Sequence, residues 1–129
     1  MKYLCLIHTD PSGWERLTPE QRQAGMAAYM AYGEGLKKAN QYVQASRLQP
    51  PTTATVVRVR DGKVSTTDGP FAETKEQFGG YYLIEARDLN EAIQVAAKIP
   101  GARFGCVEVR PIAEDAQTLA LGLNTPGAE

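Results

Sequence analysis

Hydrophobic and polar positions alternate along several short stretches of the chain, as they do in β-strands with one buried face. Residues 3–8 are apolar and β-prone and end at an Asp-Pro-Ser-Gly sequence, which predicts a first, central strand. Residues 53–60 alternate strictly, and Asp61-Gly62 after them predicts a type I′ hairpin that returns along residues 63–67. Further extended segments are predicted at residues 42–45, 79–86 and 105–109.

Two helices are predicted from start signals and from apolar residues at helical spacing. The first begins at Thr18, because Thr-Pro-Glu-Gln supplies an N-cap, a proline suited to the first helical position and a glutamine that completes a capping box. The second begins at the Asp88 cap and ends at Pro100-Gly101. The expected buried positions are Met26, Tyr29, Met30, Gly33, Leu36 and Lys37 in the first helix, and Ala92, Ile93, Ala96, Ala97 and Ile99 in the second.

Three glycines interrupt the first helix, and each weakens it by up to about 1 kcal/mol relative to alanine. Gly25, Gly33 and Gly35 therefore indicate that another element packs closely against this helix. The remaining expectations are one helical turn at residues 74–77, a weak helix at 113–121 and a disordered end at 124–129.

The predicted order of elements is β-α-β(β)-β-α-β, which is typical of an α+β fold of the ferredoxin-like, split βαβ type. Two helices then cover one face of an antiparallel sheet. The other face is also largely apolar by alternation, so it requires a partner surface. We expect a homodimer in which two such sheet faces meet, because a symmetric self-contact is the commonest way to bury a face of this kind.

Length, charge and cysteine content limit the functional classes. The 129 residues, 43% of them hydrophobic, suffice for one domain with a core, and the net charge of −1 offers no attraction for nucleic acid or a membrane surface. Cys5 and Cys106 are expected to be two buried, reduced thiols rather than a disulfide. No metal-ligand spacing is present, so no metal or cofactor is expected. The N-terminal apolar stretch of about five residues is too short for a signal peptide, and we expect a soluble cytoplasmic protein.

The densest stretch of chemistry is Asp68-Gly-Pro-Phe followed by Ala-Glu-Thr-Lys-Glu-Gln-Phe-Gly-Gly-Tyr-Tyr-Leu-Ile-Glu-Ala86. With Leu-Gln-Pro-Pro at 48–51 and Cys-Val-Glu-Val-Arg-Pro at 106–111, it resembles the DGPF branch of the YCII-related proteins. The resemblance covers residues 1–112 and leaves 113–129 as a tail. It implies a dimeric α+β barrel like that of muconolactone isomerases. Members of the branch often occur beside extracytoplasmic-function sigma factors, which implies a possible regulatory partner.

The resemblance also implies a His–Asp pair in a pocket between the first helix and the sheet. Asp68 matches the aspartate, while Tyr29 stands where the relatives have the helix histidine. The one histidine of this chain, His8, ends the first strand instead. The pair is therefore incomplete, unless His8 or Tyr29 takes the missing role.

Each of these three residues also has an interpretation that involves no chemistry. Asp68 precedes Gly-Pro, where its carboxylate either accepts hydrogen bonds from its own turn or faces a pocket as a general base. His8 is either a satisfied residue at a strand end or a proton-transfer group, because an imidazole titrates near neutrality. Tyr29 is either a core residue with one hydroxyl partner or a proton donor.

Weaker candidates surround the signature. Glu73, Lys75 and Glu76 form either a solvated turn or part of a binding loop, and Arg47 and Arg58 are candidate anion ligands. Trp14 is either a lid over a cleft or an apolar plug, and Gly79-Gly80 is explained by a close-packed strand entry rather than a phosphate-binding loop.

Two functional hypotheses follow. The first is a non-catalytic dimeric module that binds a small ligand or a regulatory partner such as a sigma factor. The alternative is a cofactor-independent enzyme for proton transfer, isomerisation or elimination, with Asp68 as base and His8 or Tyr29 as donor. The missing helix histidine favours the module, whereas the pocket-forming fold favours the enzyme.

Overall fold

The structure is a computed structural model that describes residues 1–124. Its six strands are β1 (Lys2–Thr9), β2 (Tyr42–Arg47), β3 (Thr55–Arg60), β4 (Lys63–Asp68), β5 (Gln77–Glu85) and β6 (Cys106–Pro111). Its helices are α1 (Pro11–Glu15), α2 (Pro19–Lys38), α3 (Leu89–Ala97) and α4 (Ala116–Ala120), with short 3-10 turns η1 (Pro51–Thr53) and η2 (Pro100–Arg103).

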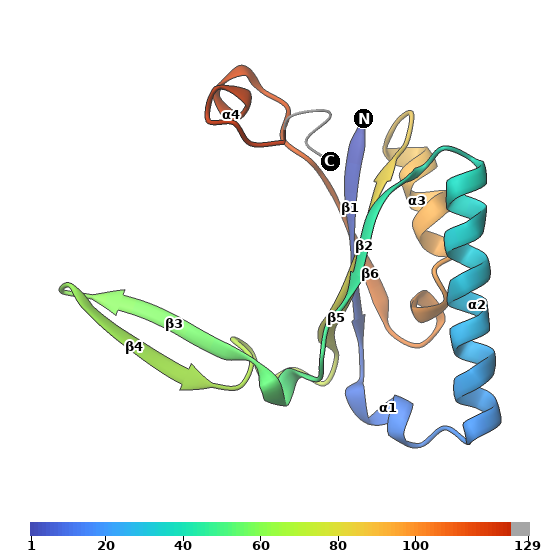
Figure 1. Ribbon diagram of the computed structural model, residues 1–129, viewed down its shortest axis with the longest axis horizontal. Coiled ribbons are helices and arrows are strands. Elements are labelled where there is room, and N and C mark those ends of the chain that lie inside the picture. Colours follow the sequence, from blue (N-terminus) through green and yellow to red (C-terminus); the bar gives the residue numbers. More distant parts are fainter. Residues whose placement is uncertain (125–129) are drawn as a thin grey trace.

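Four strands form one antiparallel sheet in the order β2-β5-β1-β6, so β1 is central as predicted. Helices α2 and α3 lie on one side of this sheet, and no helix within residues 1–124 covers the other side (Figure 1). This arrangement confirms the ferredoxin-like α+β fold.

The period of two along the strands sorts side chains between the two faces of the sheet. In β1 the buried positions Tyr3, Cys5 and Ile7 alternate with half-buried Leu4 and Leu6. The first set packs with α2, α3 and Ile84 of β5 in the core. The second set lies on the uncovered face, which is therefore apolar in its centre, as the sequence predicted.

Helix α2 begins as expected, since the Thr18 hydroxyl accepts from the Gln21 N–H and the Gln21 side chain accepts from the Thr18 N–H. Its expected buried face was wrong in part, because Met26 and Met30 are 58% and 72% exposed. The side chains that turn toward the sheet are Tyr29, Tyr32 and Leu36. The predicted stripe covered too much of the helix circumference, and the tyrosines, being large, fill the space between helix and sheet.

Helix α3 shows a similar correction. Ala92, Ala96 and Ile99 are buried as expected, but Ile93 is 50% exposed and Val95 takes its place in the core. The Asp88 side chain caps the helix by accepting from the Glu91 N–H.

Strands β3 and β4 pair only with each other and project from the sheet as a two-stranded arm (Figure 1). Asp61 and Gly62 at its tip both have positive φ, 52° and 73°, which confirms the type I′ turn. Strand β3, the first of the hairpin, begins at Thr55 rather than at residue 53 as predicted, because η1 occupies Pro51–Thr53.

Three other expectations need comment. Residues 74–77 make no helical turn; instead the Gln77 amide donates to the carbonyl oxygens of Ala72 and Thr74 at 3.0 and 2.7 Å. The weak helix of the tail is confirmed as α4, and the expected disordered end lies outside the described residues except for Asn124. Within residues 1–124, no helix combines the length and apolar character that a membrane crossing requires.

Candidate functional site

A large open cleft lies at the end of the sheet where β1 finishes and β6 begins. Its volume is about 1780 Å³. Its walls are α1, the N-terminal half of α2, the loop of residues 72–76, and the turn η2 with the start of β6. The fold therefore places parts of the chain that are distant in sequence around one cavity.

Helix α1 forms one wall of the cleft and was not predicted, although Asp10-Pro11 is a helix start signal. The Asp10 carboxylate accepts from the Ser12 hydroxyl at 2.8 Å and the Ser12 N–H at 3.0 Å, and these bonds lower the pKa of Asp10. Asp10 is therefore a structural cap.

Trp14 of α1 closes one end of the cleft. Its ring lies 6.0 Å from the guanidinium of Arg22 and 5.5 Å from that of Arg47, within the range of cation–π contacts. It also lies 3.7 Å from the position that a Cβ atom on Gly25 would occupy, which is an ordinary van der Waals contact and does not by itself require glycine. Trp14 thus forms part of the wall of the cleft. Gly33 and Gly35 have no such neighbour among the described residues, so the expected close packing is wrong for them.

Tyr29 points from α2 toward η2 and lines the cleft. Its hydroxyl oxygen accepts a hydrogen bond from the Gly101 N–H at 2.9 Å, and burial raises the pKa of Tyr29. The phenol is therefore neutral near pH 7, and its own O–H is left to donate into the cleft. Tyr32 instead donates to the Val95 carbonyl oxygen at 2.8 Å and packs edge-on against Tyr82.

Gly101→Ala is expected to lower the free energy of unfolding by about 1–3 kcal/mol, because the new methyl group overpacks a filled site. Its Cβ would lie 2.6 Å from the Tyr29 hydroxyl oxygen and 3.1 Å from a methyl group of Ile7. Gly35→Ala is the matched control, because nothing lies within 4 Å there, and it should stabilise the helix by up to about 1 kcal/mol. Urea denaturation followed by circular dichroism measures both, and equal effects would contradict the assigned packing.

Positive charge prevails at the rim of the cleft. Four cations line it, namely Arg16, Lys75, Lys98 and Arg103, against three carboxylates, Asp10, Glu76 and Glu108. Asp10 lies 4.0 Å from Arg16, and Glu108 is paired with Arg110. By contrast, Lys75, Lys98 and Arg103 form no ion pair with any residue in 1–124.

His8 lies between this cleft and a second, smaller groove of about 540 Å³ on the uncovered side of the sheet. Its ring is 5.7 Å from that of Phe78, and its strand partner in β6 is Cys106. The groove is lined mainly by apolar residues of the segments before β3 and after β4. Because Thr74 and Glu76 line both cavities, the signature loop is the partition between them.

The two cysteines are free, as expected, but only Cys5 is buried. Burial raises the pKa of the Cys5 thiol to about 11. Cys106 is exposed, which corrects the expectation, and desolvation together with the nearby Glu76 carboxylate raises its pKa. Both groups are therefore thiols rather than thiolates near neutral pH, and neither is an activated nucleophile.

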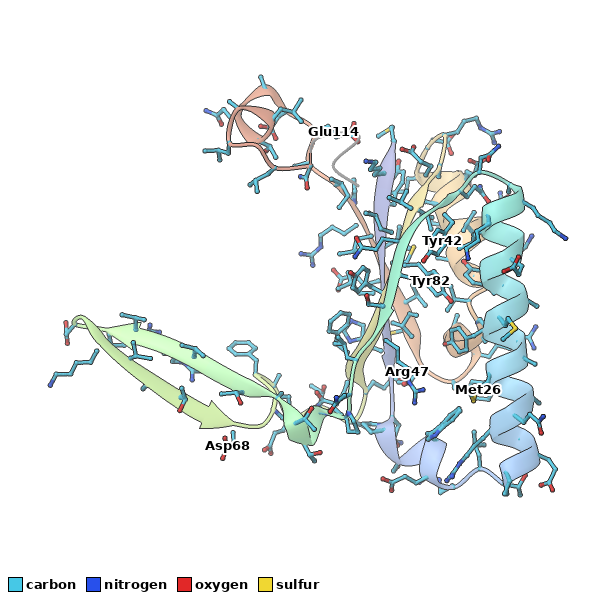
Figure 2. All side chains as sticks on the ribbon, viewed as in Figure 1. Met26, Tyr42, Arg47, Asp68, Tyr82 and Glu114 are labelled. Atoms are coloured by element: carbon cyan, nitrogen blue, oxygen red, sulfur yellow. The ribbon has the colours of Figure 1, made fainter. Side chains whose placement is uncertain are left out.

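Asp68 ends β4 at the root of the projecting hairpin, away from the sheet and from Arg47 (Figure 2). Its side chain is exposed, lines neither cavity and has no hydrogen-bond partner within residues 1–124. The expected Asx-type turn is therefore absent; the turn is made by Gly69, whose φ is +99° and whose N–H donates to Ala54. The structure brings His8 and Tyr29 to one cleft without Asp68, and their catalytic roles remain predictions.

The weaker candidates divide between the cleft and other places. Lys75 and Glu76 line the cleft, whereas Glu73 is exposed on the loop. Arg47 stacks on Trp14, and Arg58 lies on the hairpin.

The glycine pair plays two structural roles. A Cβ on Gly80 would lie 2.8 Å from the Ser46 carbonyl oxygen, which confirms a close-packed strand entry. Gly79 is the extra residue at the bulge between β1 and β5.

Sequence reasoning missed Arg16, Lys98 and Arg103 as site residues. The cluster of basic residues around Pro100-Gly101 was a usable signal, since both Lys98 and Arg103 flank the turn that binds Tyr29.

Comparisons with known proteins agree with this fold. The YCII-related domain matches residues 1–115. An uncharacterised protein of Rhizobium meliloti (strain 1021), R00369, is 36% identical over 115 residues, which cover 88% of this chain and 93% of that protein.

Solved structures of similar architecture include the following one. It is 5-chloro-2-hydroxyhydroquinone dehydrochlorinase from Burkholderia phenoliruptrix AC1100, in complex with 2,5-dihydroxybenzoquinone. The TM-score is 0.52 at 17% identity, over 91% of this chain and 98% of that one. At this identity the similarity concerns the fold.

Proposed function

This chain belongs to the YCII-related family, and we propose that its cleft binds a small organic anion with a flat apolar body. The observation that carries the proposal is the set of three cations, Lys75, Lys98 and Arg103, that form no ion pair within residues 1–124 and lie around a cavity walled by aromatic rings. Cations that lack a protein partner can pair with a ligand's carboxylate or enolate without first breaking an ion pair.

The walls suit a flat ligand. Trp14, Tyr29 and Tyr32 contribute aromatic surface, and small residues of α2, such as Ala28, leave room beside them. The free O–H of Tyr29 supplies one directed hydrogen bond inside the cleft. Pockets for small molecules commonly combine such apolar walls with a few directed polar groups.

The binding role is favoured over catalysis because the general base proposed from the sequence is elsewhere. Asp68 lies on the hairpin, so the cleft of a single chain has no pairing between that carboxylate and Tyr29 or His8. The thiols and the Tyr29 phenol are protonated near neutrality, which suits hydrogen bonding and not base catalysis. A link to a sigma factor stays a prediction.

A cofactor-independent enzyme is the second candidate. The observation in its favour is that His8, whose imidazole ring can both donate and accept hydrogen bonds, lines the same cleft as Tyr29. A protein of similar fold, at 17% identity, is a dehydrochlorinase, which is consistent with this second candidate.

The anion proposal is tested by calorimetric titration with benzoate, 3-phenylpropionate and 2,5-dihydroxybenzoquinone, and with benzamide as the uncharged match of benzoate. We expect binding of the acids, and binding of benzoate at least about tenfold tighter than of benzamide, because one charged hydrogen bond is worth about 1.5–3 kcal/mol. The double variant Lys98→Ala/Arg103→Ala should lose about tenfold or more in affinity. Lys38→Ala, at the far end of α2, is the control and should bind as the wild type does.

Three results would contradict the proposal: equal affinity for benzoate and benzamide, unchanged binding by the double variant, or no binding of any probe. The enzyme candidate is tested separately. If the His8→Gln variant binds a compound as tightly as the wild type but no longer converts it, the result would favour the enzyme candidate.

We further propose that the chain assembles as a homodimer through the uncovered sheet faces. Leu4, Leu6, Tyr81 and Leu83 occupy the centre of that face and are only half-buried in the single chain. A second copy would remove this apolar surface from water.

A further inference from the structure

Two segments project from the uncovered side of the sheet, one at each end of it (Figure 1). The first is the hairpin β3–β4. The second is the segment of residues 112–124 that contains α4, which we call the C-terminal arm. Between them lies the open sheet face, so the single chain forms a recess with an arm at either end.

The hairpin carries an exposed apolar stripe. The strand register places Val57, Val59 and Val64 on one face of it, and these side chains are 61%, 55% and 69% exposed. A two-stranded hairpin by itself is marginally stable in water. The stripe therefore needs a surface to pack against, and the described part of the chain supplies none.

The C-terminal arm has a matching apolar surface on an ordered frame. Leu119, Leu121 and Leu123 are 40%, 75% and 55% exposed. The arm is fixed by the Asp115 side chain, which accepts from the Thr118 N–H, and by the Asn124 amide, which donates to the Ala113 carbonyl oxygen. It is thus an ordered apolar surface that no other segment within residues 1–124 covers.

The charges of the two arms are opposite. The hairpin has three cations, Arg58, Arg60 and Lys63, which the register places on the face opposite to the valine stripe, and one carboxylate, Asp61, at its tip. The C-terminal arm has Glu114 and Asp115 and no cation between residues 112 and 124. Figure 2 shows Glu114 at the end of the molecule opposite to the hairpin.

We propose that in the dimer the hairpin of each subunit clasps the C-terminal arm of the other. The dimer axis that we propose runs parallel to the sheet and perpendicular to its strands, along the viewing direction of Figure 1. A rotation by 180° about this axis brings the two uncovered faces together. It also places each hairpin against the C-terminal arm of the partner. An axis parallel to the strands would instead place hairpin beside hairpin and arm beside arm. Charge selects the first, because only it pairs opposite signs.

The hairpin is long enough for this contact. Its six-residue strands span about 20 Å, at about 3.3 Å per residue, whereas two packed sheets lie only about 10 Å apart. A hairpin that leaves one sheet on its uncovered side therefore extends past the partner's sheet plane. The clasp rests on the proposed homodimer. It specifies the direction of the dimer's two-fold axis and adds a contact between hairpin and C-terminal arm to the contact between the sheet faces.

Sedimentation equilibrium with a double-mutant cycle tests the clasp. We expect Arg60→Glu and Glu114→Lys each to raise the dimer dissociation constant at least about tenfold in low salt, because each puts like charges into both clasps. The variant with both substitutions restores opposite charges and should return to within about threefold of the wild type. Glu34→Lys, an exposed residue on α2 with the same change of charge, is the control and should dimerise normally.

The outcomes separate the clasp from the underlying dimer. Leu6→Glu on the sheet face should give a folded monomer by circular dichroism if the face-to-face dimer is correct. A wild type that stays monomeric overturns both proposals. A dimer that Leu6→Glu breaks, but that neither arm substitution weakens or whose double variant is not restored, overturns the clasp alone.

Discussion

Ile84→Ala is expected to lower the free energy of unfolding by about 2–5 kcal/mol, which is the range for a large aliphatic side chain removed from a closed core. Ile84 has no exposed surface and lies in β5 opposite Tyr3 of the central strand. The core around it joins both helices of the covered face to the sheet, so little of the cavity can be filled by relaxation. Urea denaturation at fixed protein concentration measures the effect.

Ile93→Ala is the matched control for this prediction. The same substitution at Ile93, which is 50% exposed on α3, should cost less than about 1 kcal/mol apart from any change in helix propensity. A cost at Ile93 as large as that at Ile84 would show that α3 is rotated relative to the described packing, and would restore the helix face expected from the sequence.

Gly105→Ala is expected to have the second large effect, with a loss of about 1–3 kcal/mol or more from overpacking against a backbone that cannot move aside. A Cβ atom at this position would lie 2.0 Å from the His8 carbonyl oxygen. Gly105 immediately precedes β6, and its N–H donates to the Gly101 carbonyl oxygen, so a shift here moves the η2 wall of the cleft. We therefore expect weaker anion binding in this variant as well as lower stability.

Gly79→Ala provides the comparison, because no atom lies within 4 Å of its added methyl group. It should change the free energy of unfolding by no more than about 0.5 kcal/mol. Both variants add one methyl group to a glycine, and they differ in the room around that group. Calorimetric melting of both proteins therefore measures the steric effect. A Gly105→Ala protein as stable as Gly79→Ala would contradict the close approach of η2 to β1.

The elements of the fold could be predicted because their signals are local. The capping box at Thr18, the Asp88 cap and the Asp61-Gly62 turn each act within four residues, and all three form as expected. The apolar run of residues 3–8 likewise predicted the central strand, although it did not show which of its faces would be buried. The order of these elements then leaves few topologies, and the ferredoxin-like arrangement is the one observed.

The faces of the helices were less predictable. Met26, Met30 and Ile93 are apolar yet exposed, while Tyr29 and Tyr32 are turned inward. Apolar residues surround more than half of α2, so hydrophobicity alone permits several rotations of the helix. The choice among them depends on which side chains fill the gap to the sheet, which is a property of the assembled layers.

The signature segment also changed in meaning. Its density of charge around a fixed turn favoured a catalytic loop, with Asp68 as the base. In the structure this segment ends the hairpin, partitions two cavities and places Asp68 in solvent. The family assignment drawn from the same residues is confirmed over residues 1–115.

The sequence by itself determined the family, the order of strands and helices, their caps and the apolar uncovered face, because each of these depends on neighbours along the chain or on a simple period. Only the tertiary structure decided the cleft. Arg16, Lys75 and the pair Lys98 and Arg103 come from three separate segments and become one positive rim when α1, the loop of residues 72–76 and η2 meet. Charge and exposure at a site are sums over side chains from separate elements, and no local pattern contains them.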